Sequence, residues 1–167
     1  MEEYVVLVDE NDTVIGQMEK LEAHQKGLLH RAFSIFIFNQ AGELLLQKRA
    51  LGKYHSPGLW TNTCCSHPRP GEETLAAAHR KLMQEMGFDC ELKEIFHFTY
   101  EAKLDHDLTE HEFDHVLVGR YDNDPVINPE EANTFKWAPL AWIKNDITKN
   151  PDAYTVWFQI CFEKINA

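Results

Sequence analysis

The sequence predicts an α+β fold, in which helices pack against a mixed or antiparallel β-sheet. Two segments near the N-terminus, at 4–18 and 32–48, place turn residues between short runs of branched and aromatic side chains. At 72–86 the apolar residues recur every three or four positions instead, which indicates a helix. The chain has 167 residues, 44% of them hydrophobic, and this is enough to form one core. We therefore expect a single domain that spans residues 1–167.

Seven strands are expected, and the first four form two hairpins. The residues Glu10-Asn11-Asp12 form the turn of the first hairpin, and a turn ending in Gly42 closes the second. Later strands are indicated by alternating aromatic residues and by branched runs. The expected strands cover residues 4–9, 13–18, 32–38, 43–48, 95–100, 110–121 and 134–138.

Helices are expected at 72–86, for one or two turns at 139–143, and from Pro151 onwards, because proline suits the first helical position. Gly87 stands where the first helix should end. The apolar stripe of that helix is Leu75, Ala78, Leu82 and Met86, and that of the last helix is Tyr154, Trp157, Phe158, Cys161 and Ile165. Lys81 and Glu85 lie four residues apart on another face, where they form either a structural ion pair or part of a site.

The composition excludes some functions. A net charge of -11 argues against a nucleic-acid partner, since phosphate backbones are held by extended basic surfaces. No apolar run approaches the roughly 20 residues that cross a bilayer, so we expect a cytosolic protein that does not enter a membrane. The four cysteines form no CxxC pair and are expected to be reduced. An anionic small substrate would need local cations or a bound metal.

The segment 61–67 is the most informative part of the chain. It reads Thr-Asn-Thr-Cys-Cys-Ser-His between proline- and glycine-containing stretches, and it predicts a shaped loop that leads into the helix. Cys65 and His67, two residues apart, would place a nucleophile or proton donor beside a metal ligand. Taken alone, each of them is better explained as an ordinary residue, Cys65 as a small buried thiol and His67 as a loop histidine.

Glu110 and Glu112 are two residues apart on an expected strand, so both carboxylates face the same side at about 6.5 Å. Buried there, they would repel each other by roughly 2 to 3 kcal/mol at an effective dielectric near 20. The repulsion vanishes if the pair is exposed, which is the commoner case, and it is reversed if a divalent cation lies between them. Three histidines, His24, His30 and His67, would complete a donor set for Mn²⁺ or for Zn²⁺ with expanded coordination. Their spacing alone does not assemble this set, because the members come from distant segments.

Four features together resemble the type I isopentenyl-diphosphate delta-isomerases. They are the segment 61–68 (TNTCCSHP), the helix end Glu85-Met86-Gly87, Tyr100 in its strand, and the triplet Glu110-His111-Glu112. The match runs in order from Tyr4 to Trp157, and a TNxxCxHP segment followed by ExE is far more specific than a lone CxH. The resemblance implies a Nudix-like αβα sandwich around a mixed β-sheet.

The Nudix signature is incomplete in this chain. Aligned on Gly87, it keeps Glu72 and Arg80, but Ser66 replaces its first glycine, Lys81 a glutamate, and Gln84 the first of two paired glutamates. A Nudix hydrolase uses that glutamate cluster to hold the metals that activate water, so the changes disfavour hydrolysis. Glu85 is left, and it would bind a Mg²⁺ that the substrate diphosphate completes.

The resemblance implies a reversible 1,3-allylic proton shift between isopentenyl diphosphate and dimethylallyl diphosphate. It implies Cys65 and Glu112 as the acid and base, with Tyr100 in hydrogen-bond reach, and it leaves open which of them protonates the alkene. The implied metal ligands are His24, His30, His67, Glu110 and Glu112, and the implied substrate-binding residues are Lys20, Arg49, Lys53, Lys81 and Trp157. Arg80 replaces Lys81 if the register shifts by one residue, and plain packing also explains Trp157.

Two other functions stay open at this stage. One is a Nudix diphosphohydrolase that acts on a nucleotide or other diphosphate, and it is disfavoured by the missing glutamate pair and the presence of Cys65. The other is a metal-binding module without catalysis. The sequence leaves the oligomeric state open.

Overall fold

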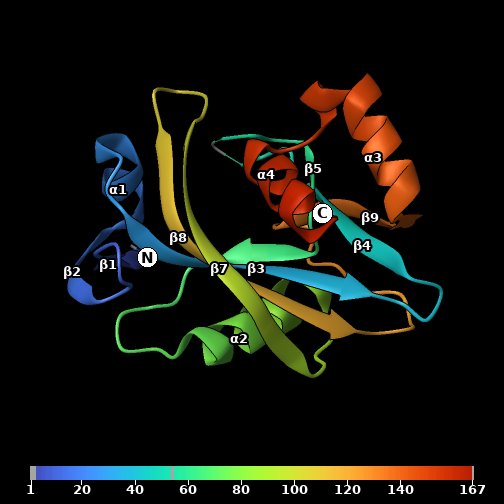
Figure 1. The fold of residues 1–167 in the computed structure, drawn as a ribbon, viewed down its shortest axis with the longest axis horizontal. Coiled ribbons are helices and arrows are strands. Elements are labelled where there is room, and N and C mark those ends of the chain that lie inside the picture. Colours follow the sequence, from blue (N-terminus) through green and yellow to red (C-terminus); the bar gives the residue numbers. More distant parts are fainter. Residues whose placement is uncertain (1–2, 54, 167) are drawn as a thin grey trace.

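The computed structural model describes residues 3–53 and 55–166, and within them nine strands form one mixed sheet (Figure 1). In chain order the elements are β1 (Tyr4–Val8), β2 (Val14–Glu19), α1 (Lys20–Lys26), β3 (His30–Phe38), β4 (Glu43–Arg49), β5 (Trp60–Thr61), β6 (Cys64–Ser66), α2 (Thr74–Met86), β7 (Leu92–Lys103), β8 (Thr109–Arg120), β9 (Ala132–Pro139), α3 (Leu140–Lys149), the 3₁₀ helix η1 (Pro151–Ala153) and α4 (Val156–Ile165). None of the described helices is both long enough and apolar enough to cross a membrane.

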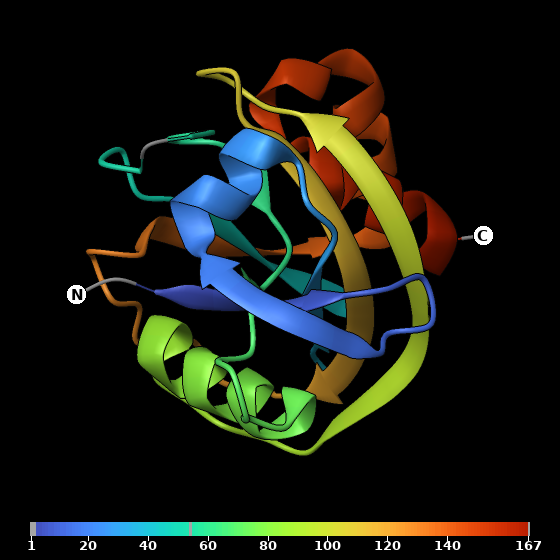
Figure 2. The ribbon, with the colours of Figure 1, turned by 90° about the vertical axis from the view of Figure 1, so that its left-hand side faces the viewer.

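Helices cover both faces of the sheet. Helix α2 lies on one face and helices α3 and α4 on the other, while the β1–β2 hairpin and α1 lie at one end (Figures 1 and 2). Leu82 and Met86 of α2 belong to one apolar cluster with strand residues, and Phe158 of α4 belongs to a second. The predicted α+β class and αβα arrangement around a mixed sheet are confirmed.

Strand β3 is central to the sheet. It pairs in parallel with β8 over nine residues, from His30–Glu112 to Phe38–Arg120, and antiparallel with β1, β4 and β6. Its sequence is almost continuously apolar because both of its faces are covered. The predicted hairpin of 32–38 with 43–48 is confirmed at its turn, where Phe38 pairs antiparallel with Leu44, but wrong in its extent, since β3 and β4 are paired at no other position. The first predicted hairpin is confirmed by the β1–β2 pairing.

Two short segments differ from the prediction. Residues 61–67 are not a plain loop, because β5 and β6 lie within or beside them and Cys65 pairs with Ser34 of β3. Helix α1 has no predicted counterpart. Its seven residues are too few to show an apolar period, and it is held by the Glu19 side chain at its start and by Gly27, with φ of 65°, at its end.

Helix α2 ends where the sequence predicts. Gly87 has φ of 72° and donates its N–H to the Met83 carbonyl at 3.1 Å, and a Cβ at this position would collide with the Val126 carbonyl. The predicted stripe is wrong at Leu75, which is 46% exposed. The buried face includes Ala77, Lys81 and Glu85 instead, because this side of the helix borders a polar pocket as well as the core.

The C-terminal region is more helical than predicted at 139–143, where α3 extends over ten residues. The predicted helix start at Pro151 is wrong. Pro151 begins a separate 3₁₀ turn, and α4 begins after Thr155, whose hydroxyl accepts the N–H of Phe158 at 3.3 Å. The predicted stripe of this helix is buried from Tyr154 to Cys161.

Glu72 and Arg80, which are retained from the Nudix signature, form a bidentate ion pair. Arg80 of α2 donates two hydrogen bonds of 2.8 Å to Glu72, and this ion pair fastens the segment before α2 to the helix. Hydrogen bonding from Arg80 lowers the pKa of the Glu72 carboxyl, although partial burial opposes the shift.

We expect Arg80→Gln to lower the free energy of unfolding by about 0.5–1 kcal/mol at pH 7, which corresponds to roughly 1–4 °C in Tm. Because the pKa of Glu72 is lowered in the folded state, the contribution is present above its unfolded pKa of about 4.3 and is lost as the pH falls through the folded value. Thermal melts at pH 7 and near pH 3 measure this difference. Arg120→Gln, which removes an exposed 3.8 Å contact with Asp122, is the control and should change neither melt.

Candidate active site

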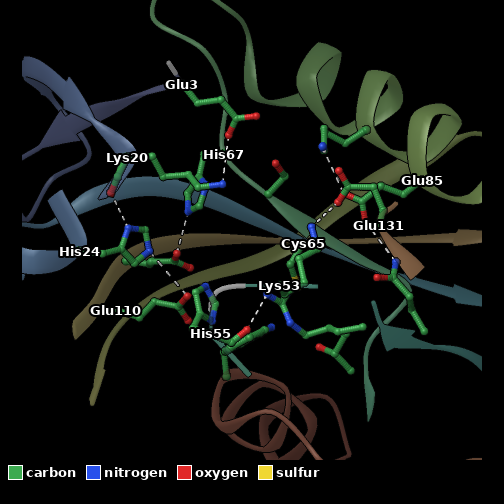
Figure 3. A pocket seen from close by; sticks show the side chains of 17 residues that line it. Glu3, Lys20, His24, Lys53, His55, Cys65, His67, Glu85, Glu110 and Glu131 are labelled. Carbon is green, nitrogen blue, oxygen red and sulfur yellow. Dashed lines mark hydrogen bonds and ion pairs between the residues drawn. The ribbon is translucent and has the colours of Figure 1, made fainter. Parts of the chain in front are cut away.

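One pocket gathers most of the predicted site residues, and it lies among α1, β4, the β5–β6 segment, α2, β8 and α4 (Figure 3). His30 and Tyr100 are the exceptions, and both lie directly behind Glu112, with which they form hydrogen bonds. The predicted residues that line the pocket are Lys20, His24, Arg49, Lys53, Cys65, His67, Lys81, Glu85, Glu110, Glu112 and Trp157.

The three predicted histidines lie together. The ring centroids of His30 are 4.9 Å from those of both His24 and His67, and the latter two are 5.8 Å apart. His24 donates its Nδ1–H to the Lys20 carbonyl at 2.7 Å, and His30 donates its Nδ1–H to the Leu28 carbonyl at 2.9 Å. Each bond places a proton on Nδ1. The Nε2 of His30 therefore contacts the Glu112 carboxylate either through a second ring proton or, with a metal ion between the two atoms, through its lone pair.

Glu112 lies at the centre of this histidine group. Its Oε2 is 3.3 Å from His30 Nε2 and 2.9 Å from His67 Nε2, and donor atoms of these three residues and His24 all lie within 4.8 Å of one another. Burial opposes the charge of Glu112, but hydrogen bonds with His30 and His67 hold its pKa well below the usual range. Burial lowers the pKa of His67 to about 4. Neutral imidazoles and an ionised carboxylate are the forms that bind a divalent metal, so these residues fit one.

Glu110 lies at the edge of the group, with its Oε2 4.0 Å from His24 Nε2. The Tyr100 hydroxyl lies between the two carboxylates, 2.8 Å from Glu112 Oε1 and hydrogen-bonded to Glu110. A phenol carries one proton, so it satisfies both contacts when one carboxyl is protonated. That carboxyl is Glu110, because burial and the charge of Glu112 raise its pKa well above the usual range.

Strand alternation separates the two adjacent cysteines. Cys64 is fully buried in the core beneath α2, whereas Cys65 lines the pocket. The Cys65 thiol donates to Asn62 Oδ1 at 2.9 Å and lies 3.6 Å from Ser34 Oγ. Burial raises the pKa of Cys65, so its sulfur keeps its proton at neutral pH.

Each lysine of the pocket contacts a carboxylate. Lys20 Nζ is 3.0 Å from Glu3, Lys81 Nζ is 3.2 Å from Glu85, and Lys53 is bound to Glu131. The charges of Glu85 and Glu131 outweigh the burial of Lys81 and raise its pKa.

The two basic residues that are adjacent on α2 lie in different surroundings. Arg80 contacts Glu72 and does not line the pocket, whereas Lys81 does. Arg49 lies over the Trp157 ring, 5.2 Å from its centroid.

Several residues of the site have no counterpart in the prediction, and three of them are titratable groups with distinctive surroundings. His55 packs between the rings of His24 and Trp157, and burial lowers its pKa to about 3. Glu131 is paired with a lysine 78 positions earlier, a separation that no local pattern reveals. Asp114 is buried behind the pocket, and burial raises its pKa to about 8. Asp114 could have been predicted from the sequence, because the period-two spacing of Glu110 and Glu112 continues to Asp114.

An αβα sandwich with a donor set that fits a divalent metal is typical of the Nudix class, and residues 28–158 match the NUDIX domain. A crystal structure of a Deinococcus radiodurans protein superposes with a TM-score of 0.82 and 18% identity, and it covers 97% of this chain and 98% of its own. A MutT NUDIX hydrolase from Burkholderia pseudomallei gives 0.63 and 19%, with coverage of 81% and 96%. At such identities the likeness shows the fold alone.

Closer relatives identify the branch of this class. Isopentenyl-diphosphate delta-isomerase 1 of Aromatoleum aromaticum is 57% identical over all of this chain and 94% of its own length. The isopentenyl-diphosphate delta-isomerase of Serratia proteamaculans is 53% identical over all of this chain and 93% of its own. The chain belongs to the isopentenyl-diphosphate delta-isomerase family.

Proposed function

We propose that the chain catalyses the reversible conversion of isopentenyl diphosphate to dimethylallyl diphosphate, a step of isoprenoid biosynthesis. The proposal rests on one observation: Cys65, Glu112 and Trp157 line the same pocket as four cationic side chains. Such a pocket offers a proton donor, a proton acceptor, an aromatic face and a place for a diphosphate. Relatives that are more than half identical carry the same name.

The reaction adds one proton to the substrate and removes another. Protonation of the terminal methylene leaves a tertiary carbocation, and loss of a proton from the neighbouring CH₂ forms the new double bond. Cys65 and Glu112 are the proposed pair. They reach the pocket from β6 and β8, which lie on different edges of β3. The raised pKa of Cys65 and the lowered pKa of Glu112 leave one proton on the pair, as a reversible shift requires.

Trp157 is the residue proposed to face the carbocation. The electron-rich face of an indole stabilises positive charge without reacting with it. The side chain is only 4% exposed and packs with Tyr100 and Ala102, so it also helps to exclude water from the pocket. Tyr100 is proposed to orient the Glu112 carboxylate and to transmit its proton through their shared hydrogen bond.

The donor set proposed to hold Mn²⁺ or Zn²⁺ consists of His24, His30, His67, Glu110 and Glu112. When bound, the ion supplies positive charge that fixes and polarises the Glu112 carboxyl. Two of the imidazoles, those of His24 and His30, are held by backbone hydrogen bonds and burial, and His67 is held by its 2.9 Å contact with Glu112. Glu110 completes the set by losing its proton, since a nearby cation favours its charged form.

The diphosphate is proposed to bind Lys20, Arg49, Lys53 and Lys81, together with a Mg²⁺ held by Glu85. The lysines exchange their carboxylate partners for phosphate oxygens, which accept charge-assisted hydrogen bonds. Glu85 is 5% exposed and oriented by Gln47, whose Nε2–H donates to it at 3.1 Å. One carboxylate is enough for Mg²⁺, which keeps several waters and takes further oxygens from the substrate.

We expect Glu85→Gln to raise the Mg²⁺ concentration needed for half-maximal activity and to increase KM about tenfold or more, because one charged ligand is lost. Transition-metal content should not change, since Glu85 is outside the histidine group. Glu73→Gln, an exposed change just before the same helix, is the matched control. An unchanged Mg²⁺ dependence in Glu85→Gln would contradict the proposed magnesium site.

The decisive test of the function is incubation with isopentenyl diphosphate and Mg²⁺, followed by identification of the product. Dimethylallyl diphosphate is expected, with no release of phosphate or pyrophosphate from nucleoside diphosphates. Hydrolysis is disfavoured because Lys81 stands where the Nudix signature has a glutamate and the side chain at Gln84 is exposed and outside the pocket. Rapid hydrolysis without an allylic product would instead establish a diphosphohydrolase.

A further inference from the structure

A second cluster of nitrogen and oxygen donors lies on the β7–β8 ribbon. His97 of β7 and His115 of β8 are paired in register, and their ring centroids are 5.8 Å apart. Glu94 lies beside them, and one donor atom from each of these three residues lies within 4.8 Å of the others. Because His115 is three residues from Glu112 on one strand, it faces the opposite side of the sheet from the pocket. The cluster is therefore separate from the proposed active site.

An irregularity in β7 creates this arrangement. Residues three apart on a regular strand point to opposite faces, so Glu94 and His97 would not meet the same imidazole. The register of β7 against β8 shifts between Glu94 and Phe96, which leaves one extra residue on β7. Such a bulge redirects the side chains that precede it. As a result Glu94 Oε1 lies 2.6 Å from His115 Nδ1 and Oε2 lies 4.0 Å from His97 Nδ1.

The His115 ring is held on both sides by carboxylates. Its Nε2 lies 2.9 Å from Asp12 Oδ2, and Asp12 is itself fixed by two hydrogen bonds from Arg31. If Nε2–H donates to Asp12, the lone pair of Nδ1 faces the Glu94 carboxylate, and two lone pairs cannot lie 2.6 Å apart without a positive charge between them. That charge is either a second proton on the ring or a metal ion. A carboxylate that orients the far nitrogen is the usual support of a metal-binding histidine.

We propose that Glu94, His97 and His115 form a second divalent-metal site, with two imidazole nitrogens and one carboxylate, a donor set suited to Zn²⁺. Ligands about 2 Å from a tetrahedral ion lie roughly 3.3 Å apart, so Glu94 must retract slightly from His115. It can do so because the Glu94 and His97 side chains are 42% and 57% exposed, which also leaves the ion a path and a fourth position for water.

The site would join two parts of the molecule that are distant in sequence. Asp12 belongs to the turn between β1 and β2, whereas the three ligands belong to the β7–β8 ribbon. The β1–β2 hairpin continues into α1, which carries Lys20 and His24 into the pocket. A metal on the far side of the ribbon therefore has a structural role, because it holds the hairpin from which α1 extends.

The test is the zinc content of folded, active protein after dialysis against Zn²⁺. Relative to the unmodified chain, His97→Ala and Glu94→Gln should each lose one zinc per chain and keep isomerase activity. His79→Ala is the matched control, because His79 is a partly exposed histidine that also contacts a carboxylate, at 2.6 Å from Asp89. It should lose no zinc. Asp12→Asn should weaken the same site by about 10- to 100-fold.

A zinc-loaded crystal gives an independent readout, in which an anomalous peak is expected among Glu94, His97 and His115. Equal zinc content in the unmodified chain, His97→Ala and Glu94→Gln, with no such peak, would overturn the proposal and leave a protonated His115 between two carboxylates. Equal loss in His79→Ala would also overturn it, because it would show nonspecific binding to surface histidines. Neither result depends on the identity of the metal in the pocket.

Discussion

Replacement of Cys65 by alanine should reduce isomerase turnover by at least about 100-fold, the lower end of what a positioned acid or base contributes. Fold and metal content should hardly change, since the thiol lies at the pocket wall and outside the histidine group. The measurement is kcat with isopentenyl diphosphate, together with metal analysis and a thermal melt.

Cys64→Ala provides the control for this experiment, because the two cysteines are adjacent and alternate across β6. Cys64 is buried in the core cluster with Leu82, so its replacement should cost roughly 1 kcal/mol of stability and leave turnover near that of the unmodified chain. Equal losses of turnover in the two variants would remove Cys65 from the proposed acid–base pair.

Glu112→Gln should abolish measurable turnover and also lower transition-metal affinity. The amide has nearly the same shape, but it has no negative charge for a cation and cannot serve as the acid or base. It would also leave His30 and His67 without the ionised oxygen that both now contact. The measurements are turnover and the content of Mn²⁺ or Zn²⁺ after equilibration with each ion.

Glu110→Gln is the comparison for this variant, because Glu110 is one strand repeat away and lies at the edge of the donor group. It should weaken metal binding more than it lowers turnover of the metal-saturated protein. If the unmodified chain binds neither Mn²⁺ nor Zn²⁺, the five-ligand proposal is wrong, whatever the activity of the two variants.

Local pairs of the site could be predicted from the sequence alone, whereas the assembly of the whole site needed the family resemblance. Glu110 and Glu112 share a face because a strand has a period of two, and Lys81 and Glu85 meet because a helix has a period of 3.6. The convergence of His24, His30 and His67 follows no such period. It depends on α1, which is too short to have a recognisable pattern, and on the parallel pairing of β3 with β8.

The errors in the fold have similar causes. A short turn between 32–38 and 43–48 predicts a hairpin, but β3 instead pairs along its length with a strand about 80 positions later, which no local signal encodes. Pro151 is typical of a helix start, and it does begin a 3₁₀ turn. Helix α4 begins only at Val156, because the hydroxyl of Thr155 caps it there. The cytosolic location and the single domain stay predictions from the sequence.

The parallel pairing of β3 with β8 also bears on how the chain acquires its chemistry. His30 and Glu112 are neighbours in this ladder although 82 positions separate them in the sequence. Closing such a long loop costs entropy before any contact repays it, so pairings of this kind form slowly. The histidine–carboxylate group therefore cannot exist in a chain whose sheet is incomplete. During refolding, tight metal binding should appear only with the native sheet, and the rate at which it appears measures how fast this long-range pairing forms.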